Sequence, residues 1–182
     1  MTVPVARPVA LSGLARSRLV LVLFAAMALQ LVVASRVQLD GVHPDLMVLT
    51  AAAAGVVAGP SRAATVGFVA GLFNDLFLQT PFGLSALTFC LVAYAVATLQ
   101  GGVLRASWWV PALTAVVATA GGEVLYALIG AIVGQGQMLT DRLGPIAGIV
   151  GGTDGVLAVV AVPALGWAFR TEPARRISRS RW

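Results

Sequence analysis

Long apolar stretches dominate this chain, and short polar or glycine- and proline-rich segments separate them. A helix needs about 20 residues to cross the roughly 30 Å hydrocarbon layer of a membrane. Six apolar segments are predicted to cross it, and the second needs flanking residues to lengthen it. Their approximate bounds are 19–34, 46–58, 63–78, 82–99, 108–133 and 143–169. The predicted fold class is therefore an all-α membrane protein with a six-transmembrane-helix bundle.

Turn signals support these boundaries. Gly59-Pro60-Ser61-Arg62 ends the second segment, Gln79-Thr80-Pro81 follows the third, and Gly101-Gly102 follows the fourth. Glycine and proline are the strongest local breaks in regular structure. The last two segments are long enough to tilt or kink, and prolines at 111, 145 and 163 give places for a bend.

The ends of the chain are more polar than its middle. Residues 1–18 are predicted to be a cytoplasmic N-terminal arm, 19–170 the transmembrane domain, and 171–182 a basic cytoplasmic tail. The first segment has an alternative interpretation as a secretory signal peptide, with Arg16 and Arg18 as its charged region and a small residue at Ala34. Because five further apolar segments follow, the protein stays in the membrane under either interpretation.

The arginines predict an orientation for six spans. With the N-terminus inside the cell, ten of the twelve cationic residues fall on the cytoplasmic side, and only Arg36 and Arg142 fall outside. This asymmetry is typical of inner-membrane proteins, whose cytoplasmic loops are rich in arginine and lysine. The sequence therefore predicts a multi-pass protein of the cell inner (cytoplasmic) membrane with both termini in the cytoplasm.

Composition narrows the class of protein further. Hydrophobic residues make up 59% of the chain and charged residues 10%, whereas soluble domains carry about 25% charged residues. The lipid bilayer is therefore the expected solvent. A net charge of +5 does not indicate nucleic acid, because the basic tail directly follows an apolar segment and suits the anionic membrane surface. The single cysteine, Cys90, excludes an internal disulfide, and no metal-ligand spacing occurs.

Three acidic residues fall inside predicted spans, namely Asp75, Glu123 and Asp154. A charged side chain near the bilayer centre costs about 3 kcal/mol on insertion scales, so these residues are expected to face the protein interior. They are candidates for protonation, for hydrogen bonds to other helices or for pairing with a partner's cation. The glycines around Glu123 and Asp154 are compatible with tight packing or with a cavity.

Asp75 belongs to a row of small and polar residues. Gly67, Gly71 and Asp75 recur at intervals of four and share one helical face, with the amide of Asn74 beside the acid. A pair of glycines four residues apart lets another helix approach closely. The row is a candidate helix-packing seam, either within the bundle or against a partner.

Enzyme signatures are sparse. His43 is the only histidine and lies in a predicted outside loop, so a serine–histidine or zinc–histidine site within the membrane lacks its key group. One enzyme hypothesis survives, in which Asp75 and Asp154 share a proton as an aspartyl dyad. We expect no catalytic residues, no metal and no cofactor.

From Pro44 onward the chain resembles the rod shape-determining MreD family of bacteria. The resemblance lies in Pro44-Asp45-Leu46, in the run from Gly67 to Phe77, and in Pro81-Phe82-Gly83-Leu84-Ser85-Ala86-Leu87. It implies a non-enzymatic subunit of the cell-elongation machinery, with an MreC scaffold, MreB filaments and peptidoglycan synthases as partners. It also implies a fold similar to the substrate-binding subunits of energy-coupling vitamin transporters. The alternative function is such a small-molecule transporter subunit.

Overall fold

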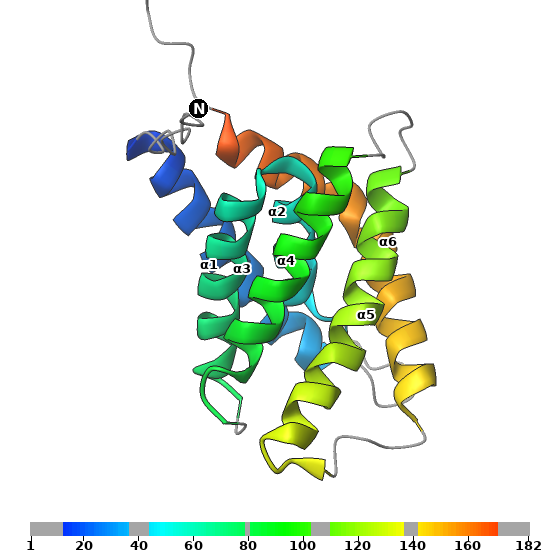
Figure 1. Ribbon diagram of the computed structural model, residues 1–182. Helices are drawn as coiled ribbons and strands as arrows, with labels where there is room; N and C mark the ends of the chain where they lie inside the picture. The colour runs from blue at the N-terminus through cyan, green and yellow to red at the C-terminus, as the bar shows by residue number, and fades with distance from the viewer. Residues whose placement is uncertain (1–12, 37–43, 79–80, 103–109, 137–141, 171–182) are drawn as a thin grey trace, which may run out of the picture.

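The computed structural model describes residues 13–36, 44–78, 81–102, 110–136 and 142–170. Within these ranges the chain is helical and forms no β-strand (Figure 1). The helices are α1 (Gly13–Arg36), α2 (Leu46–Val57), α3 (Pro60–Asp75), α4 (Leu84–Gly102), α5 (Val110–Ile132) and α6 (Leu143–Phe169). Each of the six predicted segments corresponds to one of these helices, so the predicted all-α, six-helix fold is confirmed.

Two helices are longer than the apolar pattern predicted. Helix α1 begins at Gly13, within the segment predicted to be an arm, and α4 continues to Gly102. The added residues of α1 include arginine and leucine, which are good helix formers. A long arginine side chain can also keep its charge in water while its stem lies on apolar surface. The hydrophobic pattern therefore marks the membrane-buried part of α1 better than it marks the helix end.

Within the described ranges, three segments are long and apolar enough to cross a membrane, namely Gly13–Val32, Leu113–Ile132 and Leu143–Phe169. The shorter apolar segments are Leu46–Val57 and Leu84–Gln100. With 12 residues, α2 is only about 18 Å long at 1.5 Å per residue. The protein is a membrane protein, and α2 is too short to cross the hydrocarbon layer by itself.

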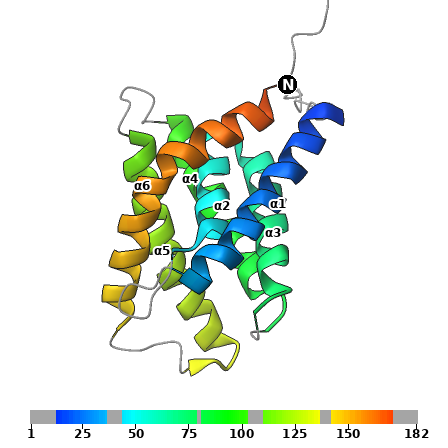
Figure 2. The same cartoon turned by 180° about the vertical axis from the view of Figure 1, so that it is seen from behind.

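Helix α2 lies inside the bundle, surrounded by the other five helices (Figures 1 and 2). Ten consecutive residues, from Leu46 to Gly55, are buried. The four alanines from Ala51 to Ala54 have no exposed surface. Because alanine adds only a methyl group, neighbouring backbones can pack close to this helix on every side.

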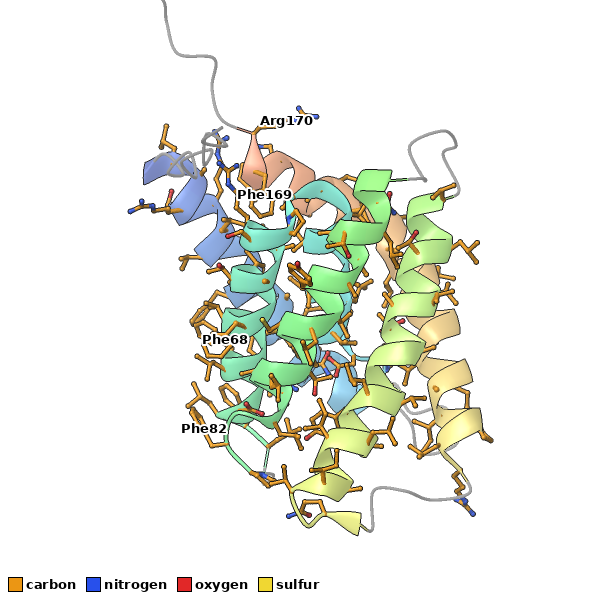
Figure 3. The ribbon with its side chains drawn as sticks, in the orientation of Figure 1. Phe68, Phe82, Phe169 and Arg170 are labelled. Atoms are coloured by element: carbon orange, nitrogen blue, oxygen red, sulfur yellow. The ribbon has the colours of Figure 1, made fainter. Side chains whose placement is uncertain are left out.

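Large apolar side chains cover the outside of the bundle. Phe24, Val156 and Val160 are each more than 60% exposed, and Figure 3 shows Phe68 and Phe82 pointing away from the helices. Such a surface is unsuited to water and suits lipid chains. Like a soluble protein, the bundle has an apolar core. It differs from a soluble protein because its outer face is apolar as well.

The described ends of the chain, Gly13 and Arg170, lie at the same end of the bundle (Figure 1). Arg18 joins them there. Its guanidinium lies 4.9 Å from the centroid of the Trp167 ring and donates a hydrogen bond of 3.4 Å to the carbonyl oxygen of Arg170. Helix α6 reaches this contact by changing direction along its length (Figure 2), and Pro163 inside it lacks the N–H that a straight helix would use.

Two side chains satisfy the first turn of α2 at the opposite end. One carboxylate oxygen of Asp45 accepts hydrogen bonds from the amides of Met47 at 2.9 Å and Val48 at 3.1 Å. From α1, buried Gln30 accepts from the Leu46 amide at 2.7 Å and donates to the Pro44 carbonyl oxygen at 3.3 Å. The first amides of a helix have no partner within the helix, and lipid supplies none.

We predict that Gln30→Leu destabilises the bundle, because it leaves the Leu46 amide and the Pro44 carbonyl without these partners. The expected loss is about 1–3 kcal/mol of unfolding free energy, read as a lower thermal midpoint in detergent. Gln100→Leu is the matched control. Its amide donates to the Thr114 hydroxyl, which keeps its own bond to Val110, so a smaller loss is expected. An equal loss in both variants would contradict the role given to Gln30.

Candidate functional site

The glycine row of α3 packs directly on the backbone of α4. A Cβ atom placed on Gly67 would lie 2.9 Å from the Ala93 Cβ and would overlap the carbonyl oxygen of Phe89. On Gly71 it would lie 2.5 Å from the amide nitrogen of Ala86. Only glycine fits at either position with α4 where it is. The face that these two residues share is therefore occupied by α4 of the same chain.

Asp75 caps the helix that Gly71 contacts. One carboxylate oxygen accepts hydrogen bonds from the amides of Gly83 at 2.8 Å and Ala86 at 3.3 Å, and the other accepts from Ser85 at 3.0 Å. The Nδ2 atom of Asn74 lies 3.5 Å from the Ser85 hydroxyl. A carboxylate at a helix N-terminus satisfies free amides and interacts favourably with the helix dipole. Asp75 thus joins the end of α3 to the start of α4.

The structure brings all four residues predicted for the seam to one contact between α3 and α4. Sequence spacing placed Gly67, Gly71 and Asp75 on one face but gave no sign that Asp75 caps α4. Capping residues normally lie within three residues of the amides they bind, whereas Asp75 reaches eight to eleven residues ahead. The turn formed by Pro81 and Gly83, with φ of +98° at Gly83, makes this reach possible.

The other two predicted intramembrane acids lie elsewhere, together with a third acid. Glu123 of α5 and Asp154 of α6 are close enough to Asp45, at the start of α2, to interact electrostatically with it. Asp154 has no exposed surface. Neither of its carboxylate oxygens has a hydrogen-bond partner among the described residues. The sequence did not indicate Asp45 as a member of this group, because it falls before the apolar segment.

A cavity of about 280 Å³ opens beside these acids, at the end of the bundle away from Gly13 and Arg170. Its polar lining comes from Asp45, Asn74, Glu123 and Tyr126. Val150 also lines it, and Asp154 follows one helical turn later on α6. Four helices and the start of α2 therefore enclose one small, partly acidic space.

A second hollow is apolar and lies on the outside, between α4 and α5. It has a volume of about 600 Å³, and its walls include Leu91, Leu99, Val117 and Leu125. Gly121 also lines it, and a Cβ atom at Gly121 would meet nothing within 4 Å. We call this surface the α4–α5 groove. Its lining suits a lipid chain or an apolar helix.

The sequence raised the question of two kinds of catalytic site, one built on a histidine and one on an aspartyl dyad. No group of three histidine, cysteine, aspartate or glutamate side chains in the described ranges could hold a metal ion. His43 lies outside these ranges. The two members of the hypothetical aspartyl dyad have different surroundings, because Asp75 accepts hydrogen bonds from amides of α4 while Asp154 interacts electrostatically with Asp45 and Glu123.

Fold and site together define an all-helical membrane protein in which the best-formed polar contacts hold helices to one another. The family model described as rod shape-determining protein MreD matches residues 14–143, more than half of the chain. The chain belongs to this family, so the family resemblance is confirmed. No curated protein and no solved structure matches the chain. The matched region extends from α1 through α5 and includes the contact between α3 and α4.

We predict that Gly71→Ala destabilises the protein, because the new methyl group overlaps the α4 backbone. Overpacking of this kind costs about 1–3 kcal/mol. Gly148→Ala is the matched control, since a Cβ atom there meets nothing within 4 Å and alanine favours a helix over glycine by about 1 kcal/mol. Thermal unfolding in detergent measures both. Equal midpoints for the two variants would show that α3 and α4 are not packed as described.

We also predict a graded effect at Asp75. Asp75→Ala removes the acceptor of three amides, those of Gly83 just before α4 and of Ser85 and Ala86 within it, and is expected to cost about 1–3 kcal/mol. Asp75→Asn keeps one acceptor oxygen and should cost less. The measurement is the thermal midpoint of the purified protein. A protein that tolerates Asp75→Ala without loss would refute the capping role.

Proposed function

We propose that this chain is a non-enzymatic inner-membrane subunit of the bacterial cell-elongation machinery that binds an MreC-type scaffold. In this role it helps to position peptidoglycan synthesis, with peptidoglycan synthases and MreB-type filaments as further partners. The observation that carries the proposal is the family match over residues 14–143. Membership in a rod shape-determining family supports a role in cell shape. We propose the named partners in addition to that role.

The distribution of charge supports the proposed orientation. Arg16, Arg18, Arg62 and Arg170 lie at the end of the bundle that carries Gly13, whereas Arg36 and Arg142 lie at the opposite end. Placing the richer end in the cytoplasm follows the positive-inside rule. The cytoplasmic filament would then meet the end of the bundle that carries more arginines. The peptidoglycan enzymes would work on the opposite side of the membrane.

The packing of α3 restricts where a partner helix can bind. Because α4 covers Gly67 and Gly71, the glycine row of α3 is not free to receive a scaffold helix. The α4–α5 groove is open, apolar and within the matched region. Gly121 removes side-chain bulk from its wall, which favours close approach of another helix. We therefore place the scaffold's transmembrane helix in this groove.

Co-purification with the MreC-type scaffold tests the groove. Gly121→Leu fills the groove, so this variant should no longer co-purify with the scaffold. Its own abundance and thermal midpoint should stay normal. Gly148→Leu on α6 is the control, because it adds the same bulk at an equally open glycine outside the groove and outside the match. Retention of the scaffold by Gly121→Leu would refute the groove, and loss only in Gly148→Leu would place the contact on α6.

Cell shape tests the function itself. Cells depleted of the protein should lose their rod shape and become rounder, and the wild-type gene should restore it. Gly71→Leu should fail to restore it, because a bundle that cannot pack α3 on α4 cannot support assembly. The readouts are cell width and the amount of protein in the membrane. Depleted cells of normal width would refute the proposed role.

A further inference from the structure

Three acidic side chains from distant parts of the sequence lie near enough to interact electrostatically beside the first turn of α2. Asp45 precedes α2, Glu123 belongs to α5 and Asp154 to α6, and the packing of α5 and α6 on α2 brings them together. Asp45 and Glu123 line the 280 Å³ cavity. Like charges so close to one another are unfavourable unless a proton or a positive charge compensates them.

Asp154 gives the clearest indication that a partner is lacking among the described residues. It has no exposed surface, and both of its oxygens lack a hydrogen-bond partner in the part of the chain that the structure describes. Ile146, Val150 and Asp154 follow one another at intervals of four on α6, and the first two line the cavity. Asp154 therefore lies one helical turn beyond Val150 on the same face of α6, although it does not line the cavity itself. Burying a carboxyl group without a hydrogen-bond partner is unfavourable, and it is far more so when the group is ionised.

The remaining lining indicates what kind of positive charge would fit. The volume lies near the lower end of small-molecule sites, which measure about 300–1,000 Å³, and exceeds what one bare ion fills. Phe89 and Tyr126 offer aromatic rings, whose faces attract organic cations. Apolar walls from Val48, Leu78 and Val150 would hold a short hydrocarbon body. The described acids do not form a three-ligand metal site.

We propose that this cavity binds a small organic cation, with its ammonium or guanidinium group held by Asp45 and Glu123 and supported electrostatically by Asp154. The cation is either a free amine or the ammonium headgroup of a lipid, which share the same recognition chemistry. The proposal does not depend on the scaffold contact, and its failure would leave the role in cell shape untouched.

The test uses the full-length protein in nanodiscs of phosphatidylglycerol, which lacks an ammonium group. Benzylammonium and agmatine are the probes, and benzyl alcohol is the neutral control of matched shape. Both amines should raise the thermal midpoint in a saturable manner, and benzyl alcohol should not. Failure of both amines, or an equal effect of benzyl alcohol, would overturn the proposal.

Two variants connect the effect to the cavity. Glu123→Gln should weaken amine binding by roughly tenfold or more, as expected for loss of a charge-assisted hydrogen bond, while Tyr94→Phe in the α4–α5 groove should bind as wild type does. Asp154→Asn should reduce the amine response yet keep or raise the midpoint without amine, because it removes a buried unpaired carboxyl group. A wild-type amine response in both acid variants would overturn the site.

The source of the cation is resolved by changing the lipid. Nanodiscs containing phosphatidylethanolamine should raise the midpoint without added amine if the headgroup occupies the cavity, and Glu123→Gln should abolish this gain. If the natural ligand is a free amine, the lipid change has no effect and soluble amines still stabilise the protein. Both results support the cation site and differ only in its occupant.

Discussion

The fold depends on the complete burial of α2, a helix too short to cross the membrane. Its alanines let five other helices pack around it, and its first amides lie where neither water nor lipid can satisfy them. Gln30 and Asp45 supply those hydrogen bonds. The same first turn lies beside Glu123 and Asp154, so the requirement for polar groups there also shapes the acidic cavity.

A second constraint operates between α3 and α4, where backbone meets backbone. Gly67 and Gly71 remove side chains from the contact, and Asp75 fixes its end by capping α4. In lipid, helices gain little from the hydrophobic effect when they associate, so close packing and interhelical hydrogen bonds must hold them together. This pair of helices uses both, and it leaves the α4–α5 groove as the open surface of the matched region.

The sequence was sufficient to predict the six helices, because apolar runs and glycine–proline breaks are strong local signals in membrane proteins. It also placed Gly67, Gly71 and Asp75 on one face, since the helical repeat fixes that. It did not reveal which helix the face meets, that Asp75 caps α4, or that Asp45 joins Glu123 and Asp154. These are contacts between distant segments, and one chain's spacing carries no information about them. The partners and the membrane orientation stay predictions.

The surroundings of α2 have a consequence for biosynthesis. Helix α2 leaves the ribosome well before α6 but owes part of its enclosure to it, because Leu46 and Leu49 pack against Ala158 of α6. Until α6 has been made and inserted, one flank of α2 lacks its covering. The nascent bundle must therefore wait for the synthesis of α6 before its centre can close, and quality control would have that interval in which to recognise unfinished copies.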